Sequence, residues 1–114
     1  MAAHATSRLG ALARTVPGLA QSNLGDAAHG GAIMTFIDMA LFAGGHMAGM
    51  TDTDAVTLDL STQFIGAGRL GVPMDAEVEL LRETGRLAFL RGLVVQGDAT
   101  VASFAGTLRK IGPR

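Results

Sequence analysis

Cysteine, tryptophan and tyrosine are all absent from this sequence of 114 residues. Without cysteine the chain can have no disulfide, no thiolate nucleophile and no thiolate metal site, which fits a reducing compartment. Without tryptophan and tyrosine, any apolar pocket must be lined by phenylalanine, methionine and aliphatic side chains. The N-terminus also lacks the continuous apolar run found in signal peptides. We therefore expect a cytoplasmic protein.

Strong charge of either sign is missing as well. The chain has nine Lys and Arg residues and ten Asp and Glu residues, so its formal net charge is −1. This balance gives no electrostatic field that would hold a polyanion, and we expect no nucleic-acid partner. Charged residues make up 17% of the chain and hydrophobic residues 48%, which is enough apolar material for a folded core. At this length we expect one domain over residues 1–114.

One long apolar stretch, residues 30–50, could be a transmembrane helix by its length. Its 21 residues are enough to span a bilayer, and its only ionisable side chains are Asp38 and His46. However, Asp38 lies near the middle, where a carboxylate costs about 2.5–3.5 kcal/mol in a membrane, and five glycines dilute the hydrophobicity. We therefore expect no membrane span. Because the apolar side chains occur on all sides, we expect residues 31–47 to form a helix enclosed by the rest of the protein.

The second half of the chain shows the alternation of half-buried strands, in which successive side chains point to opposite faces. We expect strands over residues 56–61, 72–80, 86–96 and 100–110, with a tight turn at Gly97-Asp98. Residues 1–14 are expected to be an N-terminal extension or a short helix, and residues 15–28 a loop.

An all-apolar helix followed by four strands favours one architecture. A twisted antiparallel sheet that wraps around the helix gives the sheet its core and covers the helix in turn. The sequence thus predicts an α+β protein with the hotdog fold, an antiparallel β-sheet wrapped around one long central apolar helix.

The start of the predicted helix contains the residues best suited to chemistry. Asn23 lies six residues before the sequence His29-Gly30-Gly31, and Asp38 lies nine residues after His29. This pattern resembles that of the hotdog acyl-CoA thioesterases related to the phenylacetate-pathway (PaaI-type) thioesterase. The resemblance covers about residues 15–111 and continues through residues 56–59, 64–68, 85–86 and 105–109.

The resemblance implies a role for each matched residue. In that family the aspartate is the nucleophile or general base, the glycine after the histidine donates its N–H to the thioester oxygen, and the asparagine helps to hold the substrate. By position these residues are Asp38, Gly30 and Asn23. Thr57 matches a hydroxyl residue that lies near the attacking water in some members. No cofactor is implied, because coenzyme A is part of the substrate.

Physical arguments single out the same region. Gly30 and Gly31 begin a helix, so their N–H groups lack intrahelical acceptors and suit a substrate carbonyl that becomes an oxyanion. Asp38 has poor helix propensity and is costly to bury alone, so we expect it to line a cleft. His29 is a further catalytic candidate, although an imidazole at a helix start more often bonds loop backbone.

Each candidate also has a simpler explanation. The glycine pair could serve only a tight turn, Asp38 could face solvent or pair with an arginine, and Asn23 could be a turn residue. Because all of these residues occur together in one pattern, an active site is favoured over the separate simpler explanations.

Two other patterns do not predict sites. Residues 66–71 match the Gly-x-Gly-x-x-Gly sequence of dinucleotide sites, but they lead into an alternating strand where that motif requires a helix. His29, Asp38 and His46 lack the spacing of metal ligands, and we expect no metal site. The sequence does not distinguish among five arginines that could meet coenzyme A phosphates, namely Arg69, Arg82, Arg86, Arg91 and Arg109.

Three functions remain open, since fold alone does not decide function. The first is hydrolysis of an acyl-CoA thioester, by water attack or through an acyl-enzyme on Asp38. The second is hydration or dehydration of an acyl thioester, which typically uses a histidine in a proline-rich loop, unlike His29. The third is an acyl-CoA-binding module without catalysis, which would not need Asp38. The acid at the matched position favours the first, and the acyl length, the aromatic preference and the choice between coenzyme A and a carrier protein stay open.

Helix geometry predicts a second copy of the chain at the site. Gly30 and Asp38 are eight residues apart, about 12 Å along a helix axis, so one thioester cannot contact both within one chain. A homodimer with antiparallel helices brings Asp38 and Thr57 of one copy to Gly30 and Asn23 of the other. The family resemblance points the same way and implies that dimers pair into a homotetramer.

Overall fold

The computed structural model of the chain describes residues 2–6, 10–18, 27–50 and 54–111, so that Asn23 lies outside the described residues. The elements in chain order are β1 (Ala2–Thr6), β2 (Gly10–Thr15), β3 (Ala27–Ala28), α1 (Gly30–Met47), β4 (Ala55–Phe64), β5 (Gly68–Arg69), β6 (Met74–Glu83), β7 (Leu87–Gln96) and β8 (Ala99–Lys110). The predicted helix and all four predicted strands are present, with bounds shifted by a few residues.

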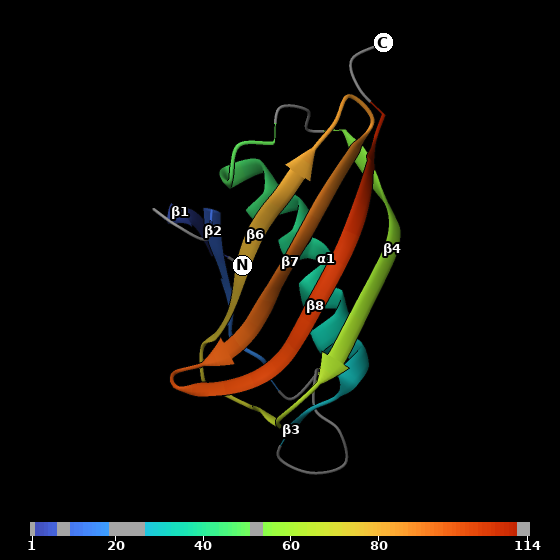
Figure 1. Cartoon of the computed structure of the whole chain (residues 1–114). Coiled ribbons are helices and arrows are strands. Elements are labelled where there is room, and N and C mark those ends of the chain that lie inside the picture. Colours follow the sequence, from blue (N-terminus) through green and yellow to red (C-terminus); the bar gives the residue numbers. More distant parts are fainter. Residues whose placement is uncertain (1, 7–9, 19–26, 51–53, 112–114) are drawn as a thin grey trace.

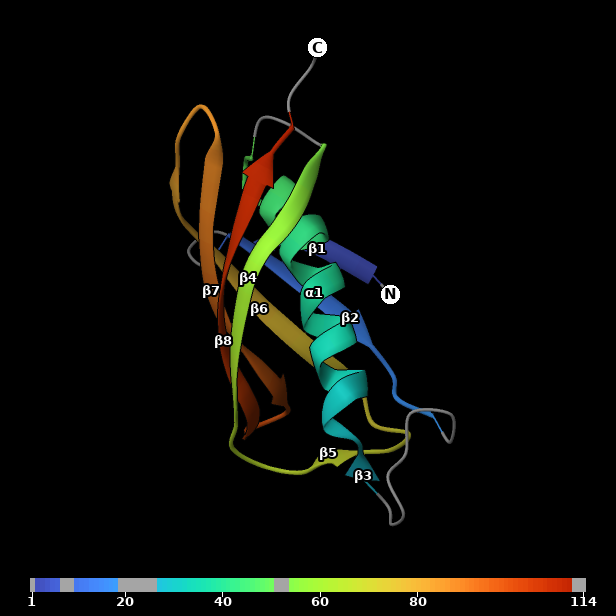
Figure 2. The same ribbon diagram turned by 90° about the vertical axis from the view of Figure 1, so that its right-hand side faces the viewer.

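The main sheet has six antiparallel strands in the order β1-β2-β6-β7-β8-β4. Helix α1 packs on one face of this sheet, and the strands curve around it (Figure 1 and Figure 2). The two-residue strands β3 and β5 pair in a small separate sheet at the end where α1 begins (Figure 2). The predicted arrangement, an antiparallel sheet around one helix, is confirmed.

The core lies between α1 and the inner face of the sheet. Ile37 and Leu41 of the helix are fully buried, as are Val78 of β6 and Leu108 of β8. Burying one such side chain stabilises the fold by roughly 1.5–3 kcal/mol relative to leaving it exposed. The helix lies close to β6 at Gly44, where an added Cβ would be 2.6 Å from Cγ2 of Val78. A larger residue at Gly44 would therefore push the helix away from β6.

Both the helix and the edge strand β4 leave apolar side chains exposed. Met39 and Met47 of α1 are 52% and 40% exposed, so the enclosure predicted for the helix is complete only on its core side. Among the described strands, β4 pairs only with β8, and its Val56 and Leu58 are 44% and 54% exposed. Within the described residues, no helix is long and apolar enough to cross a membrane.

The N-terminal segment corrects the sequence prediction. The short helix expected within residues 1–14 does not form, because residues 10–15 pair as β2 with β6, and β1 pairs with β2 in turn. Arg14 lies directly opposite Asp75, and its Nε and Nη2 donate to the two carboxylate oxygens at 2.6 and 3.0 Å. This hydrogen bonding, with the charge of Asp75, raises the pKa of Arg14 above its ordinary value. Pairing with an open sheet edge thus overrides the local helix propensity of an Ala- and Leu-rich segment.

The connections agree with the turn predictions. Gly97-Asp98 joins β7 to β8, and Gly97 has φ +58°, a conformation that favours glycine. Residues 66–71 connect strands and contain β5, and the strand β6 follows them. The segment therefore lacks the helix that a dinucleotide-binding glycine motif requires.

Candidate active site

Helix α1 begins with a histidine cap. His29 is the N-cap residue, with φ −73° and ψ 157°, and its Nδ1 accepts a hydrogen bond from the Ala32 N–H at 3.0 Å. The His29 carbonyl also accepts from Ala32 and Ile33, at 3.1 and 3.2 Å. The imidazole therefore satisfies one of the free N–H groups of the first turn, the structural role weighed above.

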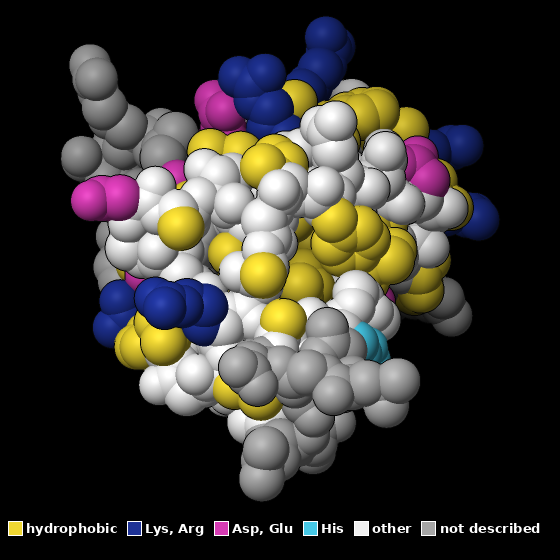
Figure 3. Space-filling model, turned by 90° about the horizontal axis from the view of Figure 1, so that it is seen from below, with side chains coloured by type: hydrophobic (Ala, Val, Ile, Leu, Met, Phe, Trp, Pro, Cys, Tyr) yellow, Lys and Arg dark blue, Asp and Glu magenta, His cyan; other side chains and the backbone are white. Residues whose placement is uncertain are grey.

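Gly30 and Gly31 are the first two helical residues, and both are exposed. Helix geometry gives their N–H groups no acceptor four residues earlier, so the positive end of the helix dipole and two donors face outward. Hydrophobic side chains gather on the surface at this end of the molecule (Figure 3). The arrangement can bind a carbonyl oxygen that gains negative charge.

Phe64, the last residue of β4, lies against this helix start. An added Cβ at Gly30 would lie 3.2 Å from Cζ of the Phe64 ring, although the side chain as a whole is 49% exposed. The ring thus forms one wall beside the Gly30 N–H. Phe64 was predicted only as part of the family pattern, because nothing in a strand-end phenylalanine indicates which helix terminus it will contact.

Asp38 and Thr57 are brought together by α1 and β4. The Thr57 hydroxyl donates a hydrogen bond to Asp38 Oδ1 at 2.7 Å, and both residues are half-buried. The pairing of β4 with β8 shifts register between Thr57 and Asp59, which marks a β-bulge. Bulges of this kind redirect a side chain locally, here beside the Asp38 carboxylate. Asp38 is thus half-buried with a hydroxyl partner, an arrangement that was not among the alternatives weighed for it.

The chain does not bring all predicted site residues together. Asp38 meets Thr57 halfway along α1, whereas Gly30 lies at the helix start with His29 and Phe64. The two groups are separated by eight residues of one continuous helix, about 12 Å along its axis. Within one chain, the predicted oxyanion donors and the predicted catalytic carboxylate therefore lie apart.

A cavity of about 130 Å³ lies beside the first half of α1, on the side of β2. Ala28 and Ala32, on either side of the glycine pair, contribute to its wall, and Phe36 and Met39 continue the wall along the helix. Thr35 is the only polar helix residue in the lining, and its hydroxyl already donates to the Gly31 carbonyl at 2.9 Å. The cavity lining is thus mainly apolar. Its large side chains are phenylalanine, methionine and isoleucine, as expected in a chain without tryptophan and tyrosine.

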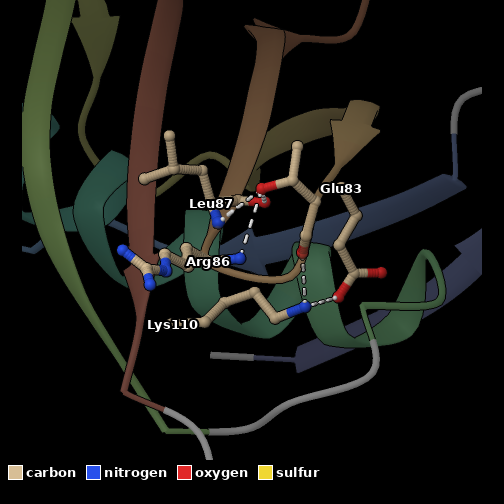
Figure 4. Close-up of polar contacts among 5 residues, drawn as sticks. Glu83, Arg86, Leu87 and Lys110 are labelled. Atoms are coloured by element: carbon tan, nitrogen blue, oxygen red, sulfur yellow. Dashed lines mark hydrogen bonds and ion pairs between the residues drawn. The ribbon is translucent and has the colours of Figure 1, made fainter.

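The opposite end of the sheet contains a partly buried polar network (Figure 4). Lys110 Nζ, on a side chain only 5% exposed, donates to Glu83 Oε2 and to the Thr84 carbonyl, both at 2.8 Å. The Thr84 hydroxyl accepts from the N–H groups of Arg86 and Leu87, at 3.2 and 2.9 Å. These contacts close the β6–β7 turn against β8, far from the helix start (Figure 1). We therefore expect the network to stabilise the fold and to take no part in catalysis.

The structure adds no support for a metal site or for particular arginines as phosphate contacts within the described residues. Within the described part of the chain, no three His, Asp or Glu side chains come together in a way that could hold a metal ion. Arg91 of β7 pairs with Glu79 of β6 at 2.8 Å. The remaining four arginines are not distinguished as phosphate contacts.

Comparison with known proteins identifies relatives at the level of family and fold. The family model described as the thioesterase superfamily matches residues 25–103. A search of curated protein sequences gave no significant match.

Solved structures give close matches in fold at low sequence identity. The PaaI protein from the phenylacetic acid degradation operon of E. coli is 21% identical, with 90% of this chain and 72% of that chain covered and a TM-score of 0.78. A hypothetical thioesterase with coenzyme A from Streptococcus pneumoniae TIGR4 is 21% identical, with coverage of 91% and 80% and a TM-score of 0.80. Protein smu.793 from Streptococcus mutans UA159, bound to acetyl CoA, is 24% identical, with coverage of 90% and 82% and a TM-score of 0.79. These matches confirm the predicted hotdog fold.

Proposed function

This chain belongs to the thioesterase superfamily, and from that premise we propose that it hydrolyses the thioester of a small acyl- or aryl-acyl-coenzyme A in the cytosol. The observation that carries the proposal is the 2.7 Å hydrogen bond that presents the Asp38 carboxylate beside Thr57 on a helix whose start offers two free N–H donors. Two of the similar solved structures contain coenzyme A or acetyl CoA, which supports a coenzyme A thioester as the substrate.

In the proposed reaction, Gly30 donates its N–H to the thioester oxygen, with Gly31 beside it. Such a donor typically contributes about 2.7–4 kcal/mol to the stability of the transition state. Asp38 acts as base for water or as nucleophile, and Thr57 holds one carboxylate oxygen so that the other is directed at the reaction. The carbon–sulfur bond breaks, the acid keeps an oxygen from water, and the coenzyme A thiolate takes up a proton. Asn23 is assigned to substrate holding, and His29 keeps the helix start in place.

The complete site requires two copies of the chain, because its two half-sites, the donors at Gly30 and the carboxylate of Asp38, are separated along α1. We propose that a second copy pairs with the exposed edge of β4, where Val56 and Leu58 are uncovered, and supplies the missing half. An unpaired apolar edge strand is a ready surface for pairing with another strand. We assign a homodimer with two equivalent composite sites, and a homotetramer formed from two dimers follows from the family resemblance.

The cavity beside α1 is assigned to the acyl group. Its Ala28 and Ala32 walls flank the glycine pair, so a carbonyl at Gly30 would direct its substituent there. Engineered apolar cavities of about 150 Å³ bind benzene, so a cavity of about 130 Å³ suits a single ring or a chain of about six carbons.

A thiol-release assay across acyl-coenzyme A substrates tests the proposal. We expect turnover of hexanoyl- and phenylacetyl-coenzyme A with kcat/KM at least roughly 10-fold above that of palmitoyl-coenzyme A, which overfills the cavity. Binding of these compounds without release of thiol would identify a non-catalytic binding module. Equal turnover of all chain lengths would show that the cavity does not bind the acyl group, whereas the proposed hydrolysis would still stand.

A further inference from the structure

Gln96, the last residue of β7, is buried although it is polar. It is 6% exposed, and it is the one buried polar residue in the described part of the chain. Its side-chain amide makes three hydrogen bonds, all to main-chain groups of the loop between β4 and β6. Oε1 accepts from the Arg69 N–H at 2.8 Å, and Nε2 donates to the carbonyls of Arg69 and Val72 at 2.9 and 3.1 Å. Both amide hydrogens are therefore in use.

The two bonds to Arg69 reproduce the way in which a neighbouring strand residue would pair with it. Arg69 belongs to β5, and β5 pairs with β3, with Ala27 opposite Arg69 and Ala28 opposite Gly68. The β3–β5 sheet is separate from the main sheet. The Gln96 side chain thus connects the small sheet to the end of β7 in the main sheet.

The small sheet leads directly to the start of α1. His29 follows β3, and Gly30 follows His29. The backbone of Gly68 lies close to the same segment, because an added Cβ would be 3.4 Å from Ala28 Cβ and 3.5 Å from Ile33 Cδ1. The segment before Gly30 is therefore held by β5, and β5 is held by Gln96.

We propose that Gln96 is a positioning residue for the N–H donors of Gly30 and Gly31, acting through β5 and β3. This inference rests on the proposed function. A displacement of about 1 Å at a reacting centre can lower the rate roughly 100-fold. Because the donors act mainly on the charged transition state, their displacement lowers kcat more than it raises KM.

The test is Gln96→Met, which keeps the length of the side chain and removes all three hydrogen bonds. We expect kcat to fall roughly 10-fold or more, with KM within about twofold of the wild-type value. The matched control is Lys110→Met, which removes the ammonium group from a partly buried polar network at the other end of the sheet and should lower stability without changing kcat. A folded Gln96→Met protein with kcat within about twofold of wild type would overturn the inference.

A second readout does not depend on activity. Hydrogen exchange of the amides of Ala27 and Ala28 in β3, and of Ala32 and Ile33 in the first helical turn, should be faster in Gln96→Met than in wild type, and unchanged in Lys110→Met. If Gln96→Met does not fold, Gln96→Glu keeps the shape and the acceptor for the Arg69 N–H but lacks the amide donors, and the same changes are expected. Equal protection of these amides in wild type and variant would refute the positioning role. A wild-type protein that releases no thiol would refute the proposed function and leave the exchange experiment to decide this inference.

Discussion

The hydroxyl of Thr57 gives one Asp38 oxygen a hydrogen-bond partner at 2.7 Å, which leaves the other carboxylate oxygen for the proposed reaction. Asp38→Asn keeps the size of the side chain, but an amide can neither attack nor accept a proton at neutral pH. We expect the fold to persist and kcat to fall at least about 100-fold in a thiol-release assay. Near-normal turnover by the purified variant would exclude Asp38 as the catalytic group.

Thr57 offers a graded test of the same pair. Thr57→Val removes the hydroxyl but keeps the branched shape that suits β4, so the carboxylate loses its fixed orientation. We expect kcat to fall by roughly 10-fold with little change in KM. Thr57→Ser keeps the donor and is the control, which should retain most of the activity. A Thr57→Val protein that stays active while Thr57→Ser loses activity would indicate that the packing of the methyl group matters and the hydrogen bond does not.

At the same scale, the site could be predicted only where it has a local pattern. The spacing of Gly30 and Asp38 is visible in the sequence, and the family resemblance indicated Thr57. The contact of Phe64 with Gly30 and the bonds of Gln96 to the β5 loop were not predicted. Both join segments that are distant in the chain, and a strand-end phenylalanine or glutamine has no distinctive local signal.

The start of α1 can be changed without breaking the helix. Gly30→Pro removes the proposed oxyanion donor, and proline suits the first position of a helix. His29, with ψ 157°, already has the extended conformation that a residue before proline prefers. We expect the kcat of Gly30→Pro to fall roughly 100-fold or more while the circular dichroism of the helix is kept.

The control for this change is Gly30→Ala. Its Cβ meets the same exposed Phe64 ring at 3.2 Å, but its N–H remains. We expect Gly30→Ala to retain far more activity than Gly30→Pro. Equal loss in the two variants would mean that crowding against Phe64 lowers activity, and the oxyanion role of Gly30 would then be wrong.

The sheet end that contains Lys110 should matter for stability alone. Lys110→Met leaves the Glu83 carboxylate without its 2.8 Å partnership to the ammonium group and removes a donor from the Thr84 carbonyl. Hydrogen bonds to charged groups contribute about 1.5–3 kcal/mol, and we expect a loss of this order in the free energy of unfolding. Urea unfolding at fixed protein concentration measures it. A change below about 0.5 kcal/mol would contradict the prediction.

At the scale of elements, periodicity predicted what one segment encodes by itself. Helix α1 and the strands β4, β6, β7 and β8 have apolar patterns that identify them without their neighbours. The pairing of β2 with β6 was missed, because the segment is Ala- and Leu-rich and its strand state depends on an edge supplied by residues far along the chain. The two-residue strands β3 and β5 are too short to have a period at all.

For the whole molecule, the central prediction is that two inactive variants restore activity to one another. Asp38→Ala and Gly30→Pro are unfolded and refolded together, and a mixed dimer then has both lesions in one composite site and none in the other. We expect about one quarter of wild-type activity, since half of the dimers are mixed and each has one intact site of two. The separately refolded variants are the control. Mixed dimers without activity would show that both residues act within one chain.

The open edge of β4 has a further consequence for how the activity depends on protein concentration. If the missing half-site comes from a second copy, then an isolated protomer holds a carboxylate without its donors and donors without their carboxylate. By mass action, dilution below the dissociation constant of the dimer lowers the activity per protein molecule as well as the total rate. Under the proposed dimer, protein concentration would therefore regulate the activity, and a cell that expresses little of this chain would hold it in an inactive state.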